Sequence, residues 1–160
     1  MAAIEIRRLP TQLTITTRFE TTIEGLNADF DVHMPVVGAR IGELAASVVG
    51  PPFARFHDYT ARRVEIELGA PIAAVPPGLP EASGLPDGEI GASMLPAGDV
   101  AATVHEGSYE TLAATYDRVE AWIARNGLVA GAGPWEVYLT DPNEVADPAV
   151  YLTEVVWPLG

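Results

Sequence analysis

The stretch Glu67-Leu68-Gly69-Ala70-Pro71 recurs near the end of the chain as Glu154-Val155-Val156-Trp157-Pro158, 87 residues later. Two further pairs of segments match in the same order at offsets of 86 and 83, namely Thr17–Thr22 with Thr103–Ser108 and Gly50-Pro51 with Gly133-Pro134. Self-similarity at a nearly constant offset indicates repeated structural units, and one repeat of about 80 residues is too few for a solenoid. The sequence therefore predicts two similar halves packed about a pseudo-twofold axis.

Each half is predicted to hold a strand, a helix and two further strands. In the first half, alternating apolar residues indicate strands over 12–22, 53–59 and 62–68, and helical spacing indicates a helix that begins at Pro35. In the second half, strands are expected over 90–95, 100–105, 135–140 and 150–157, with a helix between Ser108 and Asn126-Gly127. We therefore expect an α+β fold of duplicated βαββ halves in a single domain over 1–160, with half one over about 1–75, a linker rich in proline and glycine over about 76–88, and half two over about 89–160.

The composition excludes several classes of protein. The chain of 160 residues has 22 acidic and 9 basic residues, a formal net charge of −13, and every basic residue is arginine. Such a chain is repelled by phosphate backbones, so no direct binding to nucleic acid is expected. The absence of lysine and cysteine excludes Schiff-base, P-loop and thiolate chemistry. With no signal-peptide pattern and no apolar run that could cross a bilayer, we expect a cytoplasmic protein without membrane contact.

Glu154 is the strongest candidate for a functional acid. It lies in a predicted strand whose faces are otherwise mostly apolar, and a carboxylate there must be paired, hydrogen-bonded or protonated. It could act as a general acid or base, or as the counter-ion of a cationic ligand. The alternatives are an ion pair with Arg18 or Arg55, or contact with solvent at the strand end. Its counterpart Glu67 alternates with charged residues and is expected to face solvent.

Aromatic residues are the second group of candidates. Tyr138 is the best of them, because its hydroxyl could donate to a ligand or to Glu154 on the neighbouring strand. Aromatic walls around one carboxylate suit a flat, hydrophobic and often cationic ligand. The three histidines lack metal-ligand spacing, and neither a metal ion nor a cofactor, haem included, is expected. The residues expected to contact a ligand are Phe56, Tyr109, Trp135, Tyr151 and Trp157.

Several short segments together resemble one family, the GyrI-like small-molecule-binding domain, also known as the AraC-type effector-binding domain. The similarity is carried by Leu95-Pro96-Ala97-Gly98-Asp99, His105-Glu106-Gly107-Ser108-Tyr109, Trp122 to Gly127, Glu136 to Pro142 and Thr153 to Leu159. The resemblance implies a SOUL/GyrI-like fold with a central cleft that binds amphipathic, often cationic or polyaromatic compounds. It also implies that Glu154 is the cleft acid, with Tyr138 beside it.

Three functions follow from this resemblance and from the residues. The first is a stand-alone domain, monomeric or dimeric, that binds hydrophobic or cationic small molecules. The second is a hydrolase that opens cyclopropane-containing alkylating compounds through Glu154 and Tyr138, as some stand-alone members of the family do. The third is a protein-interaction module that modulates gyrase through its acidic surface. No helix-turn-helix segment is expected, so the chain is not expected to act as a DNA-binding activator.

Overall fold

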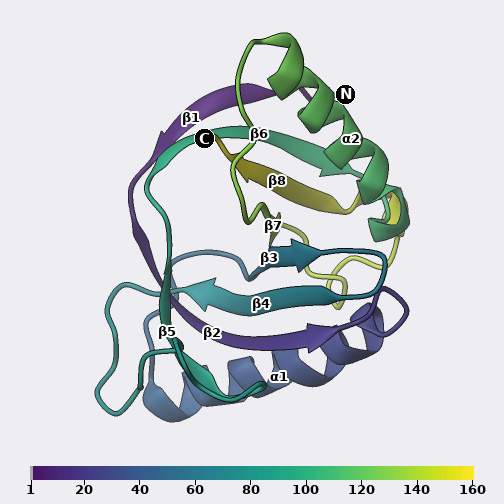
Figure 1. The fold of residues 1–160 in the computed structure, drawn as a ribbon. Helices are drawn as coiled ribbons and strands as arrows, with labels where there is room; N and C mark the ends of the chain where they lie inside the picture. Colours follow the sequence, from purple (N-terminus) through teal and green to yellow (C-terminus); the bar gives the residue numbers. More distant parts are fainter. Residues whose placement is uncertain (1) are drawn as a thin grey trace. The chain divides into compact units, whose positions relative to one another are not determined.

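Antiparallel strand pairing organises each of two units in the computed structural model, which describes residues 2–160. The central unit is Thr11–Pro96, and the terminal unit joins the chain up to Pro10 with Ala97–Gly160. Each unit holds four strands and one α-helix among the described residues (Figure 1). No described helix has the length and hydropathy needed to span a bilayer.

The central unit places one helix against a four-stranded sheet. Its strands follow the order β3-β4-β2-β5, and α1 runs along the face of the sheet that carries Ile15 and Ile66 (Figure 1). Ile15, Ile72 and Leu79 form a buried core that Ile41 and Leu44 of α1 cover. The elements are β2 (Gln12–Thr21), α1 (Leu26–Leu44), β3 (Phe53–Tyr59), β4 (Val64–Pro71) and β5 (Ile90–Leu95).

Helix α1 begins nine residues before Pro35, so the predicted start was wrong. Proline is favoured in the first turn because it lacks an N–H, but here Pro35 stands inside the helix and deletes one internal hydrogen bond. The helix ends at Ala45, whose left-handed backbone (φ 50°) lets its N–H reach the carbonyl oxygen of Gly42. The residues that open the helix, 26–33, alternate between apolar and polar, which is the period of a strand, and this hid them from a search for helical periodicity.

The terminal unit has the same construction. Its strands follow the order β1-β6-β8-β7, and α2 packs on the face that carries Ala101 and Val155 (Figure 1). Leu112, Val119 and Ile123 of α2 complete this core. The elements are β1 (Glu5–Leu9), β6 (Gly98–Glu106), η1 (Tyr109–Thr111), α2 (Leu112–Arg125), β7 (Trp135–Tyr138), η2 (Pro148–Val150) and β8 (Leu152–Pro158).

Strand register confirms the duplicated βαββ pattern. Glu67 of β4 lies opposite Arg18 on β2, and Glu154 of β8 lies opposite Val104 on β6. The two glutamates therefore hold equivalent positions 87 residues apart, as the sequence repeat predicts. The fourth strand of each sheet comes from outside the βαββ segment: β5 pairs with β2, and β1 pairs with β6.

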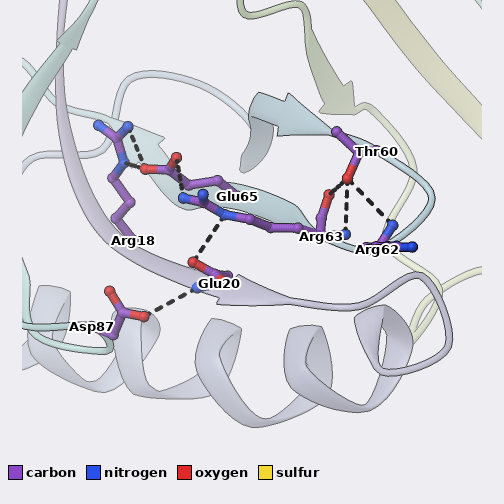
Figure 2. Close-up of polar contacts among 7 residues, drawn as sticks. All are labelled: Arg18, Glu20, Thr60, Arg62, Arg63, Glu65 and Asp87. Atoms are coloured by element: carbon purple, nitrogen blue, oxygen red, sulfur yellow. Dashed lines mark hydrogen bonds and ion pairs between the residues drawn. The ribbon is translucent and has the colours of Figure 1, made fainter.

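Two arginines of the central unit, Arg18 and Arg63, are paired with carboxylates (Figure 2). Arg63 reaches Glu20 at 2.9 Å and Glu65 at 3.4 Å, and Arg18 reaches the same Glu65 at 2.6 Å. The Thr60 hydroxyl accepts hydrogen bonds from the backbone N–H groups of Arg62 and Arg63. Pairing of this kind leaves no concentrated positive patch on this side of the sheet.

Candidate functional site

A buried carboxyl group with two phenolic donors lies under α2 in the terminal unit. Glu136 is in β7 and is 7% exposed. The Tyr116 hydroxyl, from α2, donates to its Oε1 at 2.9 Å, and the Tyr138 hydroxyl donates to its Oε2 at 2.8 Å. Glu136 lies opposite Val155, whose side chain is part of the core beneath α2, so β7 directs Glu136 and Tyr138 toward the helix.

Burial raises the pKa of Glu136, because the site disfavours the charged form. The hydrogen bonds from Tyr138 and Tyr116 act in the opposite direction and lower it, but burial is the larger effect. The pKa of Tyr138 lies well above its usual value, first because of burial and then because of the neighbouring Glu136. The phenol thus stays a proton donor, while the carboxyl group holds its proton to higher pH than an exposed glutamate.

Three tyrosine rings form a wall beside this carboxyl group. The ring of Tyr109 lies edge-on to that of Tyr138, with centroids 5.8 Å apart, and tilted against that of Tyr151 at 5.4 Å. Tyr109 itself is 40% exposed, so the wall formed by Tyr109, Tyr138 and Tyr151 opens to solvent. On the other side of Glu136, the Tyr116 ring meets Trp157 at 5.9 Å. Four of the aromatics singled out in the sequence are therefore found around Glu136.

Glu154, expected to be the site acid, lies on the other face of the same sheet. It lies opposite Val137 on β7. Successive residues of a strand point to opposite faces of the sheet, so Glu154 points away from α2 whereas Val155 points toward it. Arg7 of β1 donates to its Oε2 at 2.8 Å and also binds Glu5. The expected partners Arg18 and Arg55 belong to the central unit. Tyr138 donates to Glu136 and does not form the hydrogen bond to Glu154 that the sequence suggested.

The other two predicted ligand contacts, Trp135 and Phe56, are described each within its own unit. Trp135 is 2% exposed and lies opposite Val156, on the sheet face that carries Glu154. Phe56 belongs to the central unit, where its ring meets Tyr59 edge-on at 6.0 Å. The structure therefore assigns neither ring to the group around Glu136.

Glu67 does not face solvent, as the sequence alternation predicted, but is 4% exposed. Nε2 of His57 lies 2.7 Å from its Oε1. Burial raises the pKa of Glu67, but the hydrogen bond with His57 and the neighbouring Thr16 and Ser93 hydroxyls more than offset this, so the pKa lies below its usual value. The prediction failed because the face of β4 away from α1 is buried as well.

The sequence did not predict the hydrogen bond between Tyr116 and Glu136. The signal for Glu136 was as strong as that for Glu154, because Trp135-Glu136-Val137-Tyr138 also places one acid among apolar and aromatic residues. The two acids differ in their long-range partners, which are an arginine for Glu154 and phenols for Glu136. Chemically, the Glu136 group can accept a hydrogen bond, hold a proton or compensate a positive charge. The described residues contain no cluster of three or more potential metal ligands of the His, Cys, Asp and Glu types.

Comparison with known proteins identifies the family. A family model described as "GyrI-like small molecule binding domain" matches residues 39–159. No curated protein matches the sequence. Among solved structures, the EcmrR C-terminal domain has a TM-score of 0.82 at 18% identity and covers 100% of this chain and 98% of its own.

Two further structures share this fold and illustrate its range. EcmrR in complex with DNA gives a TM-score of 0.80 at 19% identity, with 99% of this chain and 57% of the EcmrR chain covered. The protein SAV2435 bound to tetraphenylphosphonium gives a TM-score of 0.67 at 9% identity, with 99% and 94% covered. At these low sequence identities the similarity to the solved structures concerns the fold alone. Family membership rests on the family model, which matches most of the sequence. The chain is thus a member of the GyrI-like small-molecule-binding family.

Proposed function

We propose that the terminal unit binds aromatic, largely apolar organic molecules, cationic ones among them, against the tyrosine wall and beside the carboxyl group of Glu136. The observation that carries this proposal is a buried carboxyl group whose hydrogen-bond partners are two phenols. Glu154 has a guanidinium partner and Glu67 an imidazole partner. The phenol partners of Glu136 carry no positive charge, so a cationic ligand would be the group that balances its carboxylate.

The chemistry of the wall supports this ligand class. Aromatic faces attract cations and stack against planar rings, and a partly exposed tyrosine pair offers such faces without a large loss of side-chain entropy. A cation close to Glu136 would favour the ionised carboxylate and lower its pKa. A neutral ligand could instead accept a hydrogen bond from the protonated acid. SAV2435, which shares the fold, was solved bound to the lipophilic cation tetraphenylphosphonium.

The test is calorimetric titration with tetraphenylphosphonium and with its neutral analogue triphenylphosphine oxide. Replacing Glu136 by Gln keeps the shape and removes the charge, with one tyrosine hydroxyl still donating to the amide oxygen and the other accepting from the amide N–H. We expect the Glu136→Gln variant to bind the cation roughly tenfold more weakly, equivalent to about 1.4 kcal/mol, and to bind the neutral analogue about as well as the wild type.

Glu154→Gln is the matched control, because it alters a glutamate of the same sheet that faces the other way. It should leave both affinities unchanged. Equal weakening by the two variants, or no binding of either compound by the folded wild type, would remove the support for Glu136 as the ligand acid.

A second candidate function is hydrolysis of strained, electrophilic compounds such as cyclopropane-bearing alkylators. The observation in its favour is the contact between the Tyr138 hydroxyl and Glu136, a proton donor beside a carboxyl group of raised pKa. Such a pair could position water and protonate the opened ring. In this proposal Glu136 takes the role that the sequence gave to Glu154. Product analysis of the alkylator incubated with wild type, Glu136→Gln and Tyr138→Phe tests it, and turnover that persists in both variants would refute it.

A further inference from the structure

A groove lies beside the first half of α2, at the edge of the terminal sheet opposite β7. Its volume is about 550 Å³, a size typical of small-molecule sites. One wall is the end of β6 at Val104 and His105, and the other is formed by Thr111 of η1 and by Ala114 and Arg118 of α2. β1 pairs with β6 only as far as Ala102, so the edge of β6 is not covered by a strand beyond that point.

The groove shares no lining residue with the tyrosine wall or with Glu136. In the sheet order β1-β6-β8-β7, strand β8 separates the end of β6 from β7, where Glu136 stands. The groove is therefore independent of the function proposed above.

Arg118 provides an unusual charge in this groove. Its Nη1 donates to the carbonyl oxygen of Ala2 at 2.9 Å, and this is the one hydrogen bond that the described part of the chain gives it. Its Nε is buried and has no partner among the described residues. Nη2 forms no hydrogen bond among the described residues and, unlike Nε, is not enclosed, so it is the nitrogen that can donate to a ligand carboxylate.

The lack of a carboxylate partner for Arg118 is notable in a chain with 22 acidic residues. Five other arginines form ion pairs with nearby carboxylates, namely Arg7, Arg8, Arg18, Arg40 and Arg63. Arg62 and Arg125 have no ion pair among the described residues, but both are exposed to solvent. The acid that lines the groove, Glu106, is exposed and forms no ion pair with Arg118. A carboxylate that accepts a hydrogen bond from Nη2 would also balance the positive charge of the Arg118 guanidinium.

The rest of the lining is rigid and mixed in polarity. His105 is 8% exposed, with Nδ1 2.7 Å from the Thr115 hydroxyl and Nε2 3.0 Å from the Thr111 hydroxyl. The groove is also lined by the apolar side chains of Val104, Ala114, Ala149 and Leu152. One cation beside several apolar groups matches an amphiphile with a single anionic head.

We propose that this groove binds a small organic carboxylate with an apolar tail, and that Arg118 holds the carboxylate through Nη2. The apolar side chains contact the tail, and His105 with its threonine partners fixes the wall of β6 relative to α2. The ligand class thus differs in charge from the cations proposed for the tyrosine wall.

Calorimetric titration with sodium octanoate, and with octan-1-ol and octylammonium as neutral and cationic analogues, tests the proposal. We expect octanoate to bind in preference to both analogues. Arg118→Met removes the charge and keeps the apolar stem, so octanoate should bind roughly tenfold to hundredfold more weakly while octanol is little affected. Arg125→Met, an exposed arginine at the end of the same helix, is the charge control and should behave as the wild type.

A second pair of variants tests the location. Ala114→Trp should fill the groove and abolish binding of octanoate, whereas Ala113→Trp, next to it but outside the lining, should not. Glu136→Gln should leave octanoate binding intact, which separates this site from the tyrosine wall. The proposal is overturned if octanoate fails to bind the wild type at millimolar concentration, if Arg118→Met binds it normally, or if Glu136→Gln abolishes its binding.

Discussion

The partner of each glutamate decides how its carboxyl group titrates. Glu67 is buried like Glu136, yet the hydrogen bond with His57 brings its pKa below the usual range. Glu136 has phenols instead, and these compensate less of the burial penalty, so its pKa is raised. Burial alone therefore does not mark a functional acid, and the chemistry of the partner must be known.

The two acids should give opposite dependences of stability on pH. A raised pKa in the folded state means that the contribution of Glu136 is fully present below its unfolded value of 4.5 and is lost as the pH rises through the folded pKa. The Glu136→Gln variant cannot ionise, so its free energy of unfolding relative to the wild type should increase as the pH rises above about 4.5. Urea unfolding at a series of pH values measures this difference.

Glu67 provides the internal comparison in the same experiment. Its lowered pKa stabilises the fold above 4.5, and this stabilisation is lost as the pH falls through the folded pKa. The cost of Glu67→Gln should therefore be largest near neutral pH and shrink in acid. If both variants showed the same pH slope, the assignment of opposite charge states to the two acids would be wrong.

The sequence chose the wrong acid as the partner of Tyr138, because the Tyr138 hydroxyl donates to Glu136 and not to Glu154. The repeat, the aromatic residues and Tyr138 were readable from strand patterns, which are local. The choice between Glu136 and Glu154 depended on Arg7, which is 147 residues from Glu154 in the chain. No local pattern reports that contact, because β1 joins the sheet through β6.

At the scale of the element, the sequence predicted where strands occur better than which faces they bury. The order strand, helix, strand, strand was recovered in both halves. Glu67 of β4 was expected to face solvent, yet it is 4% exposed, and Thr14 and Thr16 on the same face of the neighbouring β2 are 0% exposed. Alternation identifies two faces of a strand, but it assigns burial correctly only if one face is solvated.

Close approach of β2 and β4 explains one glycine and gives a prediction about strand packing. A Cβ at Gly69 would lie 2.1 Å from the carbonyl oxygen of Ile15 and 2.6 Å from Cγ2 of Thr16. The backbone oxygen cannot move without disturbing the ladder, so Gly69→Ala should destabilise the protein by about 1–3 kcal/mol.

Gly38 in α1 is the matched control, since nothing lies within 4 Å of a Cβ added there. Alanine has the higher helix propensity, so Gly38→Ala should be neutral or stabilising by up to about 1 kcal/mol. Thermal and urea unfolding of both variants measure the difference. A well-tolerated alanine at Gly69 would show that β2 and β4 are not as close as described.

At the scale of the whole molecule, each unit is completed by a strand from outside its own βαββ segment. The chain passes from β1 in the terminal unit to β2 in the central unit, and from β5 in the central unit to β6 in the terminal unit. Ile90 and Ala92 of β5 pack against the core formed by Ile15 and Ile72. The compact units therefore do not coincide with the segments 1–75 and 89–160 that the sequence repeat separates.

The pairing of β5 with β2 and of β1 with β6 predicts which fragment of the chain can fold. A fragment over 11–96 keeps α1 and all four strands of the central sheet, whereas one over 1–88 loses β5 and retains β1 without β6. The second fragment would expose Ile15 and the unpaired edge of β2, and an open apolar edge favours aggregation. We expect fragment 11–96 to give dispersed amide resonances and cooperative urea unfolding, and fragment 1–88 to give neither. Equal folding of the two fragments would mean that β5 is dispensable for the central unit and that the repeat boundary, not strand pairing, defines the folding unit.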